Sequence, residues 1–216
     1  MDIAPHQREY LSAIVAGDRR RALEAVDRAR KAGLDVASIY VRVLQPALHE
    51  VGRLWQHNEL TVAEEHLATA ITQVAMARIY GDLVAPSAPG QRSLIAACAD
   101  TERHEVGLRM VCDLMEEAGW DVTYLGAAVP TESLAALVRD RRPDAVMLSA
   151  SIAPHLPSVL RMVDAVRRAT QEGRRPFILV GGRPFRDDPA LAIRVGADAT
   201  AGDALEAVAR MRERFP

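Results

Sequence analysis

The stretch "SLIAACADTERHEVGLRM", residues 93–110, decides how the second half of this chain folds. It starts with an uninterrupted apolar run, Leu94–Ala99, and after a short polar segment it continues with apolar residues at helical spacing from Val106. Such a run predicts a strand buried on both faces, and the spacing after it predicts a helix. The polar segment between them holds a histidine, His104, with acidic residues close on either side.

The same alternation of strand and helix patterns recurs to the end of the chain. The strand candidates are Leu94–Ala99, Val122–Leu125, Ala145–Leu148, Phe177–Val180 and Ala197–Thr200. Helical patterns lie between them, for example over residues 106–119 and 158–170. Five such units predict an α/β fold, a doubly wound five-stranded parallel sheet of flavodoxin-like or Rossmann-like type, covered by helices on both faces.

The first half has helical periodicity throughout, with apolar residues three and four positions apart in four segments. Gly17 and Gly33 are predicted helix stops, and Pro46 is predicted to kink the third helix. Thr61 with Glu64 three residues later forms a capping-box pattern that starts the fourth helix. Four helices with short connections predict a four-helix bundle.

The segment "APSAPGQ", residues 85–91, carries proline, glycine and serine without periodicity, as linkers do. The predicted organisation is a helical bundle over residues 1–85, a linker over 86–92 and an α/β domain over 93–216.

Composition narrows the function classes. The formal net charge of −2, from 27 basic and 29 acidic residues, argues against a nucleic-acid-binding protein. The two cysteines, Cys98 and Cys112, form no C-x-x-C pair, so neither a zinc site nor a disulfide framework is indicated. The first residues lack a signal-peptide pattern and no apolar run approaches the length of a membrane span. We therefore expect a soluble, cytoplasmic protein.

Ligands of doubly wound folds bind beyond the carboxyl ends of the strands. Asp100–His104 follows the first strand candidate, Ser149–Ser151 the third, and Gly181–Gly182 the fourth. In the strand order 2-1-3-4-5 these strands are neighbours, so the three segments are expected side by side on one rim.

Two familiar ligand-binding classes of this architecture are excluded. A response-regulator receiver needs an aspartate after the third strand and a lysine after the fifth, where this chain has Ser149 and Ala201–Gly202. A nicotinamide-binding domain needs G-x-G-x-x-G after the first strand, and that pattern is absent, as is a P-loop.

The residue types on the rim favour a bound transition metal. A neutral imidazole such as that of His104 is a good ligand for a borderline metal, and Glu102 could fix its tautomer by accepting a hydrogen bond. Gly107 would let a bulky group lie close to the following helix, and Gly181–Gly182 would clear space beside the fourth strand.

These residues resemble the motif of the cobalamin-binding domain family, which reads D-x-H-x-x-G, then S-x-L, then G-G. This chain has Glu102-x-His104-x-x-Gly107, then Ser149-x-Ser151, then Gly181–Gly182. Glutamate in place of aspartate keeps the acceptor, and Ser151 in place of leucine alters packing.

The resemblance implies base-off cobalamin, in which the cofactor's own benzimidazole leaves the cobalt. His104 would be the lower axial ligand, Ser149 would bond the displaced tail, and the glycine pair would make room for it. Arg103 and Ser151 fall in the same implied cofactor-binding segments. The family also places a helical bundle before this domain as a cap over the upper cobalt face.

The segment "LWQHNELTVAEEH", residues 54–66, indicates which kind of cobalamin protein this is. Nine residues separate Trp55 from the pair Glu65–His66, a spacing similar to the W-x9-E-H signature of adenosylcobalamin photoreceptors of the light-dependent repressor (CarH-like) type. The resemblance implies adenosylcobalamin, with the tryptophan packed on the adenosyl group and the Glu–His pair near it. Light would break the cobalt–carbon bond, and the cap would change its position or oligomeric state.

Two departures from those photoreceptors affect the mechanism. The histidine that follows their tryptophan is Gln56 here, with His57 one position later, about 100° around a helix. His57 and His66 both stay open as upper-face ligands. Because about five residues precede the first helix, we expect no DNA-binding domain and no direct nucleic-acid or membrane partner. The expected output is a partner protein or self-association. No cysteine of the cap suits a thioether, so a bilin as second chromophore stays open.

The main expectation is thus a cobalamin-binding sensor that is not itself an enzyme. The alternative is a corrinoid methyl carrier of a methyltransferase system, whose cap should present aliphatic groups, unlike Trp55 and Glu65–His66. A detached subunit of an adenosyl-dependent mutase would need a large barrel that this chain lacks.

Overall fold

The computed structural model describes residues 3–83, 90–171 and 173–216. Its internal contacts divide the chain into two compact units, Met1–Val84 and Ala85–Pro216. Most of the predicted linker, residues 86–92, lies outside the described residues, so the domain boundaries drawn from the sequence stay predictions.

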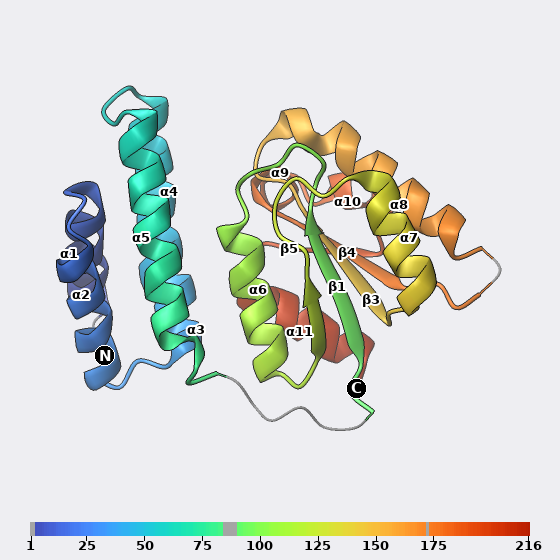
Figure 1. Cartoon of the computed structure of the whole chain (residues 1–216), viewed down its shortest axis with the longest axis horizontal. Helices are drawn as coiled ribbons and strands as arrows, with labels where there is room; N and C mark the ends of the chain where they lie inside the picture. Colours follow the sequence, from blue (N-terminus) through green and yellow to red (C-terminus); the bar gives the residue numbers. More distant parts are fainter. Residues whose placement is uncertain (1–2, 84–89, 172) are drawn as a thin grey trace. The chain divides into compact units, whose positions relative to one another are not determined.

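The helical unit is built from four helical runs (Figure 1). They are α1 (Ala4–Val15), α2 (Arg19–Lys31), the run formed by α3 (Val36–Ile39), the π-helical turn η1 (Tyr40–Leu44) and α4 (Gln45–Gln56), and α5 (Val62–Tyr80). The expected count of four is confirmed, since α3, η1 and α4 follow one another directly. At its core the fully buried Tyr10 donates a hydrogen bond of 2.9 Å from its hydroxyl to Oγ1 of buried Thr72 on α5.

The predicted helix stops are confirmed. Gly17 and Gly33 adopt left-handed φ values of 66° and 90° directly after the C-caps of α1 and α2. The N–H groups of the next residues, Asp18 and Leu34, then reach back to carbonyls of the last helical turn. Glycine takes this conformation without steric cost, so both helices end where the sequence places it.

Pro46 lies at the start of α4, and the chain directly before it forms the π-helical turn η1 instead of a regular α-helix. The N–H of Gln45 bonds to the carbonyl of Tyr40, five residues back, within η1. Proline has no N–H to donate, and its ring would clash with the carbonyl four residues before it. The wider π turn just ahead of Pro46 accommodates both effects, and it is the local form that the predicted disruption takes.

The predicted capping box at the start of α5 is confirmed. The Thr61 hydroxyl accepts from the Glu64 N–H at 3.2 Å, and the Glu64 carboxylate accepts from the Thr61 N–H at 2.7 Å. These bonds satisfy backbone donors that the first turn would otherwise leave unpaired.

The α/β unit is the predicted doubly wound parallel sheet, with strand order β2-β1-β3-β4-β5. Its strands are β1 (Ser93–Cys98), β2 (Asp121–Tyr124), β3 (Ala145–Ser149), β4 (Phe177–Gly181) and β5 (Ala199–Ala201). Its helices are α6 (Val106–Glu117), α7 (Thr131–Arg141), the 3-10 turn η2 (Ala153–His155), α8 (Leu156–Ala169), α9 (Arg183–Asp187), α10 (Ala190–Arg194) and α11 (Ala204–Arg214).

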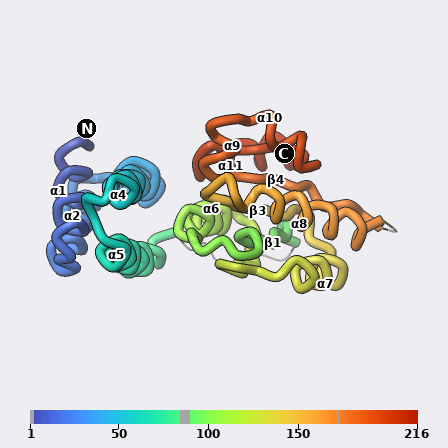
Figure 2. Tube along the Cα trace, turned by 90° about the horizontal axis from the view of Figure 1, so that it is seen from above, coloured from blue at the N-terminus to red at the C-terminus, as the bar shows by residue number. Residues whose placement is uncertain are grey.

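Both faces of the sheet are covered, as the apolar run in β1 predicts (Figure 2). Alternate residues from Ile95 to Ala99 pack in one core with α7 and α8, and those from Leu94 to Cys98 pack in another with α6 and α11. A central strand of this kind needs apolar side chains at every position.

All five strands differ from the predictions by one or two residues at an end, and β1 and β2 each lie one residue earlier in the chain than predicted. β3 extends to Ser149 and β4 to Gly181, so both residues end strands instead of following them. β5 begins at Ala199, two residues later than predicted. Ladder pairing uses backbone groups, so a serine or glycine can extend a strand beyond its apolar run. Within the described residues, no helix is long and apolar enough to cross a membrane.

Candidate functional site

The sheet register aligns the ends of three strands. Cys98 pairs with Ser149, and Ser149 pairs with Gly181, so these residues form one row across the sheet. The N–H of Ala99 continues the row by donating to the Ser149 carbonyl at 2.9 Å. The segments that follow β1, β3 and β4 therefore leave the sheet at one rim, as the strand order predicts.

A buried carboxylate, that of Glu102, joins two of these segments. It is 0 % exposed. Its Oε1 accepts from the His104 backbone N–H at 2.9 Å and lies 2.5 Å from His104 Nδ1. Its Oε2 accepts from the Ser151 N–H at 2.7 Å and lies 2.9 Å from His155 Nδ1. One side chain thus holds the polypeptide after β1 and the polypeptide after β3.

The pKa of Glu102 decides which tautomer each histidine takes. Burial alone raises the pKa of this carboxyl, but hydrogen bonds from the His104 side chain and backbone, and then from Ser151 and His155, outweigh burial and lower it from 4.5 to about 2. Glu102 is therefore ionised at neutral pH and can only accept, so both Nδ1 atoms carry the hydrogen and donate. This assigns Nε2 of His104, on a side chain 54 % exposed, as the nitrogen turned away from the carboxylate.

The backbone around Glu102 is strained. Thr101 and Ala128 adopt left-handed φ values of 74° and 51°, which cost non-glycine residues free energy. The Ala128 N–H donates to the Glu102 carbonyl, and the Glu102 N–H donates to the Ala99 carbonyl, both at 2.8 Å. Strain of this kind persists where the surroundings over-determine the conformation, as happens at binding and active sites.

His155 is the functional candidate that the sequence prediction missed. It ends the η2 turn just before α8, lies 53 positions from Glu102, and its side chain is 17 % exposed. The prediction considered only the first three residues after the third strand. Reading further into the same connection would have found the histidine, but not its shared partner.

The other rim residues of the motif lie as follows. Arg103 is exposed, and Ser149 is 8 % exposed at the end of β3. Gly107 lies in the first turn of α6, and a Cβ built there would meet nothing within 4 Å among the described residues. Open space of this kind suits a ligand that approaches the helix closely.

The two glycines of the pair, Gly181 and Gly182, differ in whether the fold leaves room for a side chain. At Gly182, with φ 105°, an added Cβ would lie 2.0 Å from the Ala150 carbonyl oxygen. At Gly181 an added Cβ would make an ordinary contact of 3.5 Å with the Ala201 carbonyl oxygen. The fold itself therefore requires glycine at 182, whatever binds nearby.

The signature residues of the helical unit lie around one helix connection. Trp55 is in the last turn of α4 and is 40 % exposed. His57 is the C-cap, and Asn58 turns the chain with a left-handed φ of 58°. Gln56 is thus the last residue of α4, and His57 lies just outside the regular helix.

Glu65 and His66 form a pair near the start of α5. His66 Nδ1 lies 2.5 Å from Glu65 Oε2, and Thr69 donates its hydroxyl to Glu65 Oε1 at 2.9 Å. The Glu65 side chain is 19 % exposed and the His66 side chain 74 %. Figure 1 shows the short connection that joins α4 to α5. Trp55 lies next to the end of α4 and His66 near the start of α5, so both lie at that end of the helical unit.

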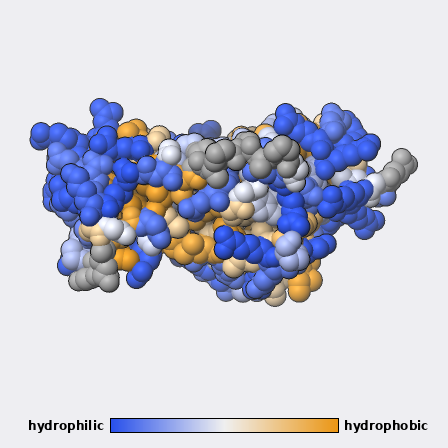
Figure 3. Space-filling model, turned by 90° about the horizontal axis from the view of Figure 1, so that it is seen from below, coloured by the Kyte–Doolittle hydropathy of each residue, from blue (hydrophilic) through white to orange (hydrophobic). Residues whose placement is uncertain are grey.

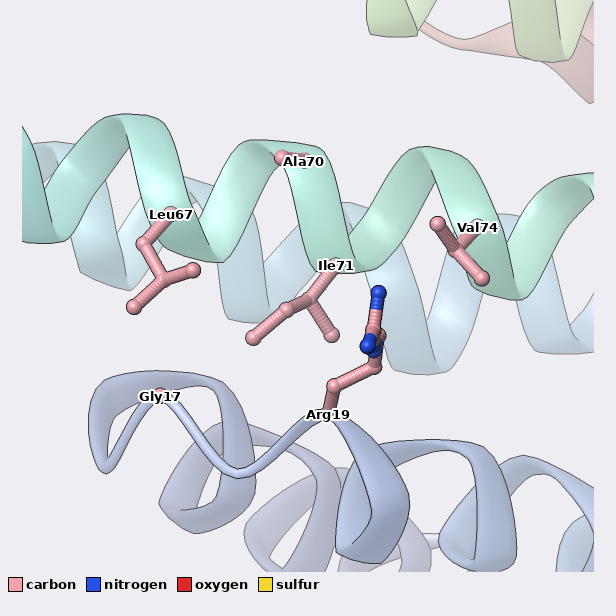
Figure 4. A pocket seen from close by; sticks show the side chains of 6 residues that line it. All are labelled: Gly17, Arg19, Leu67, Ala70, Ile71 and Val74. Atoms are coloured by element: carbon pink, nitrogen blue, oxygen red, sulfur yellow. The ribbon is translucent and has the colours of Figure 1, made fainter.

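A hollow on the helical unit lies between α5 and the turn before α2 (Figure 4). It has a volume of about 350 Å³ and is lined by Gly17, Arg19, Leu67, Ala70, Ile71 and Val74. Two apolar residues of this lining, Leu67 and Val74, are 47 % and 41 % exposed. Figure 3 shows that hydrophobic residues also lie on other parts of the molecular surface. Arg19 is the one charged side chain of this lining, so the hollow has none of the paired titratable groups of the rim.

The chain belongs to the family of B12-binding domains. Residues 92–211 match one model of the B12 binding domain, and residues 6–80 match a second model with the same description. The protein is therefore a B12-binding protein, which confirms the family that the rim motif resembles.

Its relatives fall into two groups. The chain is 31 % identical over 206 residues to the HTH-type transcriptional repressor CarH of Myxococcus xanthus, covering 94 % of this chain and 67 % of that protein. It is 25 % identical over 214 residues to dimethylamine corrinoid protein 3 of Methanosarcina acetivorans, covering 98 % of each chain.

Solved structures confirm the fold. The monomethylamine corrinoid protein of Methanosarcina barkeri superposes with a TM-score of 0.85 at 21 % identity, covering 99 % of this chain and 100 % of the other. At this identity the likeness concerns the arrangement of helices and strands.

Alanine substitutions at Gly182 and Gly107 test which glycine the fold requires and which one leaves space that a ligand could use. Gly182→Ala should lower the free energy of unfolding by about 3 kcal/mol or more, because its Cβ collides with the Ala150 carbonyl. Gly107→Ala, in helix α6 with open space beside it, should raise that free energy by up to about 1 kcal/mol. Urea unfolding of the ligand-free variants measures both. Equal effects of the two substitutions would contradict this account.

The lowered pKa of Glu102 makes part of the stability depend on pH. A carboxyl with a pKa of about 2 when folded and 4.5 otherwise contributes stability that is complete above pH 4.5 and is lost as pH falls towards 2. The shift corresponds to ~3 kcal/mol. Glu102→Gln should thus be less stable than the parent by about that amount at pH 7, and the gap should shrink between pH 4.5 and 2.

Urea unfolding across this pH range tests the dependence, with the exposed Glu132→Gln as control. A gap between Glu102→Gln and the parent that stays constant with pH would show that the Glu102 carboxylate does not titrate in this way.

Proposed function

We propose that this protein binds cobalamin in the base-off form, with His104 as the lower axial ligand of cobalt. The observation that carries the proposal is the buried, ionised Glu102, whose Oε1 holds His104 Nδ1 at 2.5 Å. A carboxylate on one ring nitrogen fixes the orientation of the imidazole and raises the basicity of the other nitrogen, which is what a metal ligand requires.

The surrounding residues fit a large planar cofactor with a displaced tail. Gly107 leaves open space beside α6 for the ring. Ser149, with the polypeptide through Ser151 and the Gly181–Gly182 pair, would hold the tail at the ends of β3 and β4. Arg103 is exposed on the same segment as His104 and would contact the cofactor's polar side groups. When bound, the cofactor supplies a cobalt centre with a cleavable upper ligand.

For the upper ligand we propose adenosylcobalamin, and light as the signal that removes it. Support comes from Trp55 followed after nine residues by Glu65–His66, and from the identity to the repressor CarH. Trp55, 40 % exposed, offers aromatic surface for the adenosyl group. His66, 74 % exposed, and His57 are the candidates to occupy the upper face afterwards.

The output we propose is non-catalytic. Loss of the adenosyl group removes contacts to Trp55 and the Glu65–His66 pair, and a ligand with differential contacts shifts a two-state equilibrium. The helical unit would pass this change to a partner protein or to a second copy of the chain. The balanced charge favours a protein partner over nucleic acid.

The alternative is a corrinoid methyl carrier that serves a methyltransferase. It is favoured by the match to dimethylamine corrinoid protein 3 over 98 % of both chains. In that case the partner would be the methyltransferase, and Trp55 would face a small methyl group.

The lower ligand can be identified by electron paramagnetic resonance of bound cob(II)alamin. Protein labelled with nitrogen-15 histidine should convert the three-line nitrogen splitting of each cobalt line into two lines, because the coupled nitrogen belongs to the protein. His104→Ala should abolish that coupling and weaken binding by about 10- to 100-fold. Splitting unchanged by the label would refute histidine ligation.

Light dependence separates the two functions. The protein is loaded with adenosylcobalamin in the dark, and absorbance and size-exclusion profiles are recorded before and after green light. We expect a permanent spectral change together with a change in oligomeric state or partner binding. Trp55→Ala should still bind cobalamin, but light should no longer change its oligomeric state or partner binding. If light changes the spectrum but neither the oligomeric state nor partner binding, and the protein also accepts a methyl group, the methyl-carrier function would be favoured.

A further inference from the structure

We propose that Tyr124 and Glu105 are positioning residues for His104, because together they tie the start of α6 to the end of β2. This inference rests on the proposed cobalamin binding and adds to it a strand residue outside the cobalamin motif and a position that the motif leaves open.

Glu105 directly follows His104 and is the N-cap of α6, yet its side chain makes no capping hydrogen bond. An acidic side chain at a helix start is normally stabilised by the free N–H groups of the first turn. Here the carboxylate turns to another element, and its Oε2 accepts from the Tyr124 hydroxyl at 3.0 Å. The start of α6, and with it the backbone of His104, is therefore tied to β2 by a side-chain contact.

The Tyr124 hydroxyl is presented from a fixed position. Tyr124 ends β2, pairs with Ala96 of β1 in the sheet, and packs against the core that β1 shares with α6. The next residue, Leu125, donates its N–H to the Ala96 carbonyl at 2.8 Å. A tyrosine side chain has only two torsions, so its hydroxyl cannot follow the carboxylate if the start of α6 shifts.

The turn after β2 leaves room for the Glu105 carboxylate. Gly126 is buried with a left-handed φ of 77°, and a Cβ added there would lie 2.9 Å from Glu105 Oε2. The Gly126 carbonyl accepts from the Cys98 N–H at 2.9 Å, so this turn is fixed to the end of β1. A carboxylate packed against such backbone has little freedom to move.

His104 thus lies between two ties to the chain around the end of β2. On one side the Ala128 N–H donates to the Glu102 carbonyl at 2.8 Å, and on the other the Tyr124 hydroxyl binds Glu105. Loss of the second tie would hold the His104 backbone less firmly, although Glu102 would still orient the ring. Metal ligands tolerate displacements of only about 0.2 Å, so the bond to cobalt is expected to weaken.

The test uses four single variants. Tyr124→Phe removes the hydroxyl and keeps the ring. Glu105→Met keeps the side-chain length without the carboxylate, whereas Glu105→Gln removes the charge but keeps an oxygen that can accept from Tyr124. Thr123→Val is the matched control, because it removes a hydroxyl that contacts Arg141 from the neighbouring position, on the other face of the same strand.

Three quantities are measured for each variant and for the double variant Tyr124→Phe with Glu105→Met. They are the cob(II)alamin dissociation constant, the fraction of bound cobalt coupled to nitrogen-15 histidine at saturating cofactor, and the thermal unfolding of the ligand-free protein. We expect Tyr124→Phe and Glu105→Met each to bind about fivefold more weakly, as for one lost hydrogen bond, and to show a smaller histidine-coupled fraction.

The double variant should lose no more than either single variant, because both substitutions remove the same contact. Glu105→Gln should keep most of the affinity and the coupling, and Thr123→Val should match the parent. If Tyr124→Phe does not fold, the comparison of Glu105→Met with Glu105→Gln decides by itself.

Parental coupling and affinity in Tyr124→Phe, even with a lower melting temperature, would overturn the inference and leave Tyr124 a merely structural residue. Additive losses in the double variant would also overturn it, and so would equal losses in Glu105→Met and Glu105→Gln. A parent protein without histidine coupling would instead refute the proposed lower ligand itself, so the two failures are distinguishable.

Discussion

The buried charge of Glu102 is the constraint on which the candidate site depends. An ionised carboxylate removed from water costs several kcal/mol unless hydrogen bonds replace its hydration. Here four donors do so, two from the segment after β1 and two from the connection after β3. Because these donors must converge, both segments are fixed in space, and the left-handed Thr101 and Ala128 are tolerated beside them.

The sheet makes this convergence possible. Parallel pairing sets Cys98, Ser149 and Gly181 in one row, so the residues that follow β1 and β3 leave the sheet together. The near approach of Gly182 to the Ala150 carbonyl shows how tightly the neighbouring connections pack. Rigid strands thus carry a polar network that the connections alone could not hold.

Fold alone does not decide what a protein does. This chain is similar in sequence both to a transcriptional repressor and to a corrinoid protein. In our proposal the rim around His104 binds the cofactor whichever of the two functions the protein has. The residues that we propose to distinguish the two functions lie in the helical unit, with Trp55 at the end of α4 and the Glu65–His66 pair at the start of α5. Specific function is therefore expected to follow from that end of the helical unit.

The sequence by itself determined the features that depend on neighbouring residues. Apolar runs and spacings predicted the strands, Gly17 and Gly33 ended helices, and Thr61 with Glu64 started one, since each acts within a few positions. The strand order followed from the fold class that the strand–helix alternation indicated. Only the tertiary structure decided that His155 shares Glu102 with His104, and that the fold requires Gly182. Those contacts join residues far apart in the chain, and no local pattern specifies which distant groups will meet.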